Sequence, residues 1–143
     1  MGTVRVIYQT RSGHTRTVAE AIADEIGVKA IDINEPASLA DTDLLFVGMG
    51  IYAGKVDQNL MDYLDQLPQN KIRGAAVFST SATASDHMEL VINLLEHKGI
   101  TVYPEHCCVK GQFMGIVSHG HPNDSDLRKA RRFAREVLDC FQD

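Results

Sequence analysis

The chain has 143 residues, of which 44% are hydrophobic and 23% charged, and its formal net charge is −5. This length and balance predict one globular domain over residues 1–143 with a sizeable core. The acidic charge argues against a nucleic-acid partner, and no apolar run reaches the roughly 18 residues that a membrane span needs. Because the N-terminus enters a strand at once, leaving no room for a leader, we expect a cytoplasmic protein with no membrane partner.

Residues 4–26 have the pattern of a strand, a loop and a helix. Residues 4–8 form a β-branched and aromatic run, and residues 14–26 repeat apolar side chains at the spacing of an amphipathic helix. The connection between them is rich in hydroxyl groups and contains a glycine. It consists of Thr10, Arg11, Ser12, Gly13, His14 and Thr15.

This connection has the chemistry of a phosphate site. Its hydroxyls are hydrogen-bond donors, Gly13 lets the backbone approach a ligand closely, and the following helix presents unpaired N–H groups and the positive end of its dipole. The alternative is that Ser12 or Thr15 only caps the helix, as Ser and Thr commonly do. Because the motif follows a strand and opens a helix, the phosphate site is the favoured interpretation.

The rest of the chain continues the alternation of strands and helices. Strands are predicted at residues 28–33, 44–47, 75–78 and 100–109, the last broken by Pro104. Helices are predicted at 57–67, at 86–98 and from a cap at Asn123 or Ser125 to the C-terminus, with Gly99 ending the second of these. The run 44–47 is apolar throughout, which is typical of a central strand buried on both faces.

This order of elements predicts an α/β fold in three layers, a doubly wound, five-stranded parallel sheet with helices on both faces. In such a sheet, ligands bind outside the carboxyl ends of the strands. The loops after the first, third and fourth strands therefore meet at one edge. All three are rich in Gly, Ser or Thr, and the second and third are expected at residues 48–55 and 79–85.

The segment from Val6 to Thr15 resembles the flavodoxin family, whose phosphate loop has the pattern T-x-[ST]-G-x-T after the first strand. The resemblance implies the strand order 2-1-3-4-5 and a bound flavin mononucleotide (FMN), with its phosphate in the first loop and its ring between the other two. Tyr52 is the expected stacking residue. The ring-binding residues so implied are Met49, Gly50, Ile51, Tyr52, Ala53 and Gly54 in one loop and Thr80, Ser81, Ala82 and Thr83 in the other.

The resemblance implies an electron-transfer protein that shuttles electrons between a flavin or iron-sulfur reductase and an acceptor enzyme. The flavin would perform the redox chemistry, so no catalytic residue and no metal ligand is predicted. The alternative on the same scaffold is an FMN-dependent oxidoreductase of the protoporphyrinogen or quinone type. A doubly wound module without flavin is less favoured, because the C-x5-R and G-x4-G-K-[ST] phosphate motifs are absent from the sequence.

Overall fold

The computed structural model describes residues 3–11, 13–39, 42–52, 55–69, 71–81, 88–110 and 122–141. The strands are β1 Thr3–Tyr8, β2 Ala30–Asp32, β3 Thr42–Tyr52, β4 Lys55–Val56, β5 Gly74–Ser81, β6 Thr101–Val102 and β7 Cys107–Lys110. The helices are α1 His14–Ile26, α2 Gln58–Asp65, α3 Glu89–His97 and α4 Asp124–Phe141. Strands and helices alternate as the sequence predicts, and the α/β class is confirmed.

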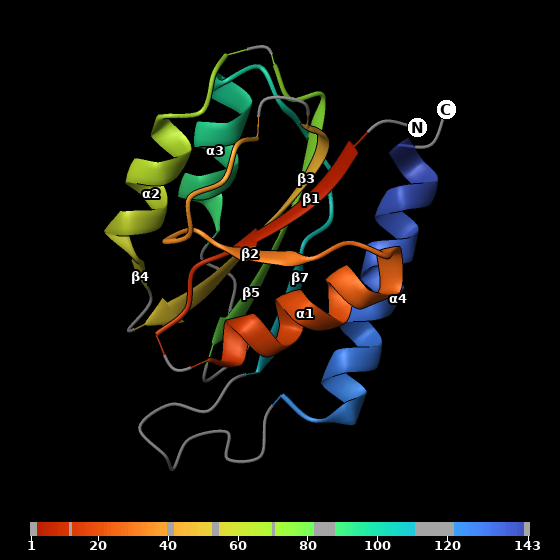
Figure 1. Ribbon diagram of the computed structural model, residues 1–143. Coiled ribbons are helices and arrows are strands. Elements are labelled where there is room, and N and C mark those ends of the chain that lie inside the picture. The colour runs from red at the N-terminus through yellow and green to blue at the C-terminus, as the bar shows by residue number, and fades with distance from the viewer. Residues whose placement is uncertain are drawn as a thin grey trace.

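The strands form one sheet in the order β2-β1-β3-β5-β6, and every pair along this path is parallel (Figure 1). β7 also pairs with β5 in parallel, so β6 and β7 together take the place of the expected fifth strand. The order 2-1-3-4-5 therefore holds for the parallel part of the sheet. The sheet also contains β4, a two-residue antiparallel addition to β3 that the sequence did not predict.

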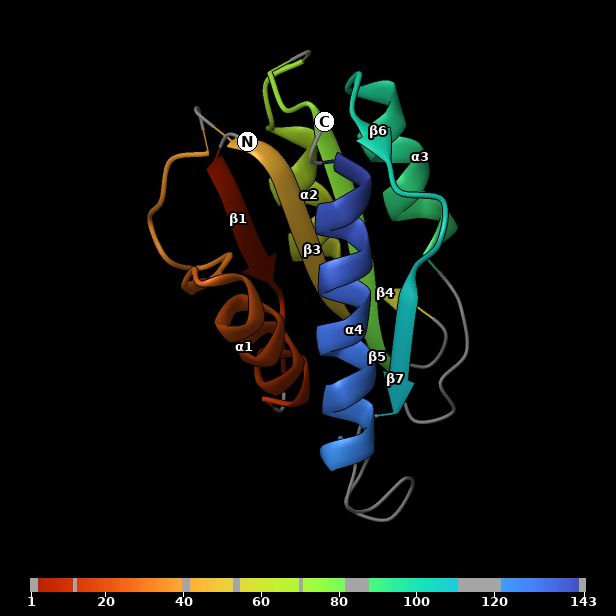
Figure 2. The same cartoon turned by 90° about the vertical axis from the view of Figure 1, so that its right-hand side faces the viewer.

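Helices cover both faces of the sheet, with α1 and α4 on one face and α2 and α3 on the other (Figures 1 and 2). The two faces bury separate hydrophobic clusters. Phe46 of β3 belongs to the α1/α4 cluster, whereas its neighbours Leu45 and Val47 belong to the α2/α3 cluster. The central strand is thus buried on both sides, which explains why its sequence is continuously apolar.

The helix α1 begins and ends where the sequence predicts. Gly13 precedes it with φ +89°, and Gly27 follows it with φ +78°, both in the left-handed region that glycine adopts at low cost. The N–H of Gly27 donates to the carbonyls of Ala23 and Asp24, which closes the last turn. The buried side chains of α1, Val18 and Ile22 among them, face the sheet.

Two loops predicted at the carboxyl edge are in part strand. β3 continues to Tyr52 and β5 to Ser81, and they remain paired as far as Ile51 with Ser81. The sequence therefore predicts the starts of the loops at 48–55 and 79–85 too early in the chain. The reason is that Gly, Ser and Thr are tolerated in a strand when a neighbouring strand supplies the ladder hydrogen bonds.

Other boundaries moved less. The strand predicted at 28–33 is reduced to Ala30–Asp32, and the break at Pro104 divides the last strand into β6 and β7, as expected. Asn123 is the cap of α4, because it exchanges hydrogen bonds with Asp126, 3.0 Å from Asp126 N to Asn123 Oδ1 and 2.9 Å in the reverse pair. None of the helices in the described ranges is long and apolar enough to cross a membrane.

Candidate functional site at the carboxyl edge of the sheet

The buried polar side chains gather at one edge of the sheet. Among the described residues there are five, and only Thr42 lies at the amino-terminal edge. The other four, at the carboxyl ends of β1 and β5 and in the first turn of α1, are Gln9, Thr15, Ser79 and Thr80. Because buried polar groups are uncommon unless they have a partner or a function, this edge is the candidate site.

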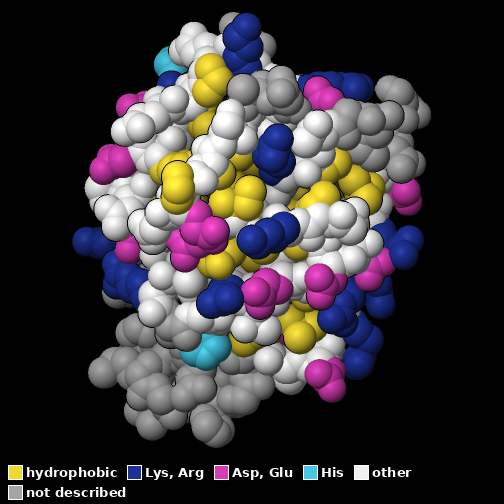
Figure 3. Space-filling model, viewed as in Figure 1, with side chains coloured by type: hydrophobic (Ala, Val, Ile, Leu, Met, Phe, Trp, Pro, Cys, Tyr) yellow, Lys and Arg dark blue, Asp and Glu magenta, His cyan; other side chains and the backbone are white. Residues whose placement is uncertain are grey.

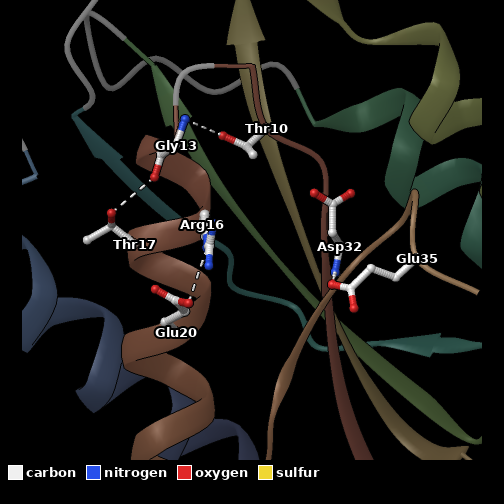
Figure 4. Close-up of polar contacts among 7 residues, drawn as sticks. All are labelled: Thr10, Gly13, Arg16, Thr17, Glu20, Asp32 and Glu35. Atoms are coloured by element: carbon white, nitrogen blue, oxygen red, sulfur yellow. Dashed lines mark hydrogen bonds and ion pairs between the residues drawn. The ribbon is translucent and has the colours of Figure 1, made fainter. Parts of the chain in front are cut away.

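The connection between β1 and α1 is held by local hydrogen bonds (Figure 4). The N–H of Gly13 donates to Thr10 Oγ1 at 2.9 Å, and the hydroxyl of Thr17 donates to the Gly13 carbonyl at 3.0 Å. The residue at the N-cap of α1 is Gly13, which has no side chain that could accept from the first N–H groups of the helix. A Cβ placed on Gly13 would meet open space, so there is room beside these donors.

Three junctions lie at this edge: the first joins β1 to α1, the second follows β3 and leads to α2, and the third follows β5. A pair of hydroxyls connects the first junction with the third. Thr15 Oγ1 lies 2.7 Å from Thr80 Oγ1, a hydrogen bond between the first turn of α1 and the end of β5. Thr15 is fully buried and Thr80 is nearly so. Two residues that are 65 positions apart in the sequence thus meet in the structure, as the three-loop prediction requires.

A carboxylate connects the first junction with the second. Asp57 caps α2, because its Oδ1 accepts from the N–H of Asn59 at 2.9 Å. Its other oxygen, Oδ2, accepts from Arg11 Nε at 3.1 Å and from Gln9 Nε2 at 3.2 Å. Sequence reasoning missed both Gln9 and Asp57, since nothing local indicates that they meet.

The other residues predicted for the site lie inside strands, at the ends of strands or helices, or outside the described residues. Met49, Gly50 and Ile51 lie inside β3 and are buried, and Met49 packs in the α2/α3 cluster rather than in a loop. Tyr52 and Ser81 end their strands, and their side chains lie outside the described part. His14 is the first residue of α1. Ser12, Ala53, Gly54, Ala82 and Thr83 lie outside the described residues.

A separate cavity of about 640 Å³ lies between α1 and β2, and it shares no residue with the predicted site. Arg16 and Glu20 line it and form an ion pair of 3.2 Å, and Glu35 lies across from them near Asp32 (Figure 4). Tyr8 forms part of its wall, and burial, followed by the Asp32 carboxylate, raises the pKa of this phenol. Mixed charges that pair with one another are typical of a solvated groove, so this cavity does not compete with the candidate site.

Residues 5–114 match the family described as "Flavodoxin domain". The chain belongs to the flavodoxin family. The chain is also 31% identical over 138 residues to the uncharacterized protein MJ0298 of Methanocaldococcus jannaschii, covering 87% of this chain and 90% of that one. The sequence-based prediction of the family is therefore confirmed.

Solved flavodoxins have the same fold. A flavodoxin from the domain Archaea superposes with a TM-score of 0.80 at 20% identity, over 98% of this chain and 99% of that one. The K13G mutant of the Fusobacterium nucleatum flavodoxin, solved with flavin mononucleotide bound, superposes with a TM-score of 0.71 at 15% identity, over 99% and 98% of the two chains. The sheet order and the two helical layers of this chain are thus those of flavodoxins.

Proposed function

We propose that this flavodoxin binds FMN and acts as an electron carrier between a reductase and an acceptor enzyme. The observation that carries the proposal is the bend between β1 and α1, which combines the family's loop pattern with a glycine at the N-cap of the helix and open space beside that glycine. The N–H groups and the positive dipole end at a helix N-terminus suit a doubly charged phosphate. FMN carries such a phosphate, and when bound it supplies the redox chemistry.

The residues at this edge fit that cofactor. Thr10 and Thr15 supply hydroxyls beside the helix N-terminus, and Thr80 joins them from β5. The protein's part would be to hold the phosphate, to orient the ring near the ends of β3 and β5, and to exclude water from the buried hydroxyl pair. None of these tasks requires a residue that reacts.

The proposed redox partners are those that membership of the family implies. The net charge of −5 suits a partner with a basic docking surface. On the face seen in Figure 3, however, acidic and basic side chains are interspersed, so this face presents no single-sign surface. Titration of reductase turnover against salt concentration tests the idea, because steering by charge weakens as ionic strength rises.

The experiment for FMN is an absorbance spectrum of the purified protein during stepwise reduction. We expect a yellow protein that binds one FMN per chain and accepts electrons from a flavin or iron-sulfur reductase. A colourless protein that binds no added FMN would contradict the proposal. Turnover of a porphyrinogen or quinone by the purified protein alone would favour the oxidoreductase alternative instead.

A further inference from the structure

The side chain of Gln9 is polar, buried and outside the set of residues that the sequence predicts for the site. It follows β1 directly and precedes the bend, and it is only 5% exposed. Its backbone N–H donates to the Gly48 carbonyl at 3.0 Å, which fixes the residue at the end of the sheet. The side chain is thereby directed from the first junction toward the second, where Asp57 lies.

The orientation of the Gln9 carboxamide is set by Asp57. Gln9 Nε2 donates to Asp57 Oδ2 at 3.2 Å, and the same oxygen accepts from Arg11 Nε. Turning the amide by half a turn would place its oxygen against the carboxylate, and two acceptors repel each other. The amide oxygen Oε1 therefore points away from Asp57.

That oxygen has no hydrogen bond. Oε1 of Gln9 is buried and without a partner, the only such side-chain atom in the part of the chain that the structure describes. A buried acceptor without a donor is destabilising, and folded proteins mostly avoid it. The missing partner must be a donor, because a carboxamide oxygen can only accept.

We propose that Gln9 is a cofactor contact, with Oε1 accepting a hydrogen bond from a hydroxyl of the polyol chain that joins the flavin ring to the phosphate. The proposal rests on the proposed binding of FMN. The phosphate is excluded as the partner, because at neutral pH it carries mainly acceptors and negative charge. The polyol is favoured because Gln9 adjoins the phosphate bend and is hydrogen-bonded to Asp57 beside the ring-binding junction, so it lies between the two ends of the ligand.

The test compares three flavins with the wild-type protein and with Gln9→Met, which keeps the side-chain length and removes the polar atoms. FMN has the ring, polyol and phosphate, riboflavin lacks the phosphate, and lumiflavin lacks the polyol as well. We expect Gln9→Met to raise the Kd of FMN and of riboflavin by the same factor, about three- to tenfold, and to leave the Kd of lumiflavin unchanged. The matched control is Gln58→Met, an exposed glutamine on α2, for which no Kd should change.

The melting temperature of the flavin-free variant provides a second measurement. Gln9→Met removes an unpaired buried acceptor, while Asp57 keeps its bonds to Arg11 and to the Asn59 N–H. The variant should therefore melt no lower than the wild-type protein. A lower melting temperature together with unchanged affinities would make Gln9 a structural residue and overturn the proposal.

The other outcomes are also decisive. If Gln9→Met also weakens the binding of lumiflavin, the contact is with the ring. If it weakens the binding of FMN alone, the contact is with the phosphate bend. Either result would overturn the polyol contact. If Gln9→Met does not fold, the wild-type protein is titrated instead with riboflavin analogues that each lack one polyol hydroxyl. Equal affinity for all of these analogues would overturn the proposal. A wild-type protein that binds no flavin would overturn the proposed function as well, whereas tight FMN binding with the wrong pattern would overturn only the role of Gln9.

Discussion

The first and second junctions at the carboxyl edge have similar compositions and different structures. After β1 the chain leaves the sheet at once, and the bend is held by hydrogen bonds among Thr10, Gly13 and Thr17. After its pairing with β1 ends at Gly48, β3 continues to Tyr52, paired with β5 as far as Ile51 and with β4 at Ile51 and Tyr52. Local side-chain chemistry thus determines the first junction, whereas pairing with a distant strand determines the second.

This difference limits how far the peptides of the second junction can turn. Gly48 and Gly50 are flanked by peptides that could turn at low cost if the strand were unpaired. Gly50 pairs with Thr80, and its neighbour Ile51 pairs with Ser81 on one side and Val56 on the other. A turn of these peptides would break ladder hydrogen bonds, so the pairing of β3 opposes it.

The largest expected effect is on stability, and it tests the second junction, which depends on pairing with a distant strand. A Cβ at Gly48 would overlap the ring of Phe78, which is fully buried and cannot move aside. We expect Gly48→Ala to lower the free energy of unfolding by about 1–3 kcal/mol, measured by denaturant titration. The control is Gly74→Ala, whose Cβ meets the ring of Phe141. Phe141 is half-buried at the end of α4 and can shift, so equal losses at the two glycines would contradict this account.

The next effect is on FMN affinity, and it tests the first junction, which depends on local side-chain chemistry. Thr15→Ala removes a fully buried hydroxyl beside the helix N-terminus, and FMN affinity should fall roughly ten- to a hundredfold. Thr15→Ser keeps the hydroxyl and should restore most of the affinity. Thr101→Ala, an exposed threonine of β6 away from this edge of the sheet, serves as the control in the same fluorescence titration. A change of less than about twofold for Thr15→Ala would remove this residue from the phosphate site.

A smaller effect tests the link between the two junctions. Asp57→Ala removes the cap of α2 together with the bonds to Gln9 and Arg11, and should cost about 1 kcal/mol of stability. Asp57→Asn keeps an oxygen for the cap and should cost less. The reason is that the Arg11 side chain is 57% exposed, and an ion pair with an exposed partner contributes little. Equal losses for the two variants in denaturant titrations would mean that the charge, not the cap, is what stabilises this link.

The smallest effect tests whether the disturbance caused by each substitution is confined to its own junction. Burial raises the pKa of Cys107 to about 11, so at pH 8 this thiol is protonated and should react slowly with a thiol reagent, after the exposed Cys140. Cys107 pairs with Phe78 across the sheet, so Gly48→Ala should speed its modification, whereas Asp57→Ala should not. Acceleration in both variants would show that the two junctions are not independent.

The same thiol gives a pH dependence. An unfolded cysteine loses its proton near pH 9, whereas folded Cys107 keeps its proton to about pH 11. Above pH 9 the unfolded state therefore binds fewer protons than the folded state, so stability should fall as the pH rises from 9 to 11. Denaturant titrations at several pH values check this, and Cys107→Ala should remove part of the slope. A stability that rises over this range would contradict the assignment.

The features that could be predicted from the sequence depend on residues only a few positions away along the chain. The start of α1 at His14, the left-handed Gly99 and the Asn123 cap depend on neighbours within four residues, and all three are found in the structure. The residues that could not be predicted depend on distant partners. Gln9 and Asp57 are 48 positions apart and neither belongs to a recognisable motif, so their contact could not be predicted from either segment.

The sequence by itself determined the alternation of strands and helices, the bend after β1 and, through that bend, the family. These follow from periodicity, glycine conformation and capping, which are properties of short segments. Only the tertiary structure decided where β3 and β5 end and which polar groups meet at the carboxyl edge. A strand ends where its neighbour stops supplying hydrogen bonds, and a buried polar group is satisfied or left unpaired by residues far away in the chain.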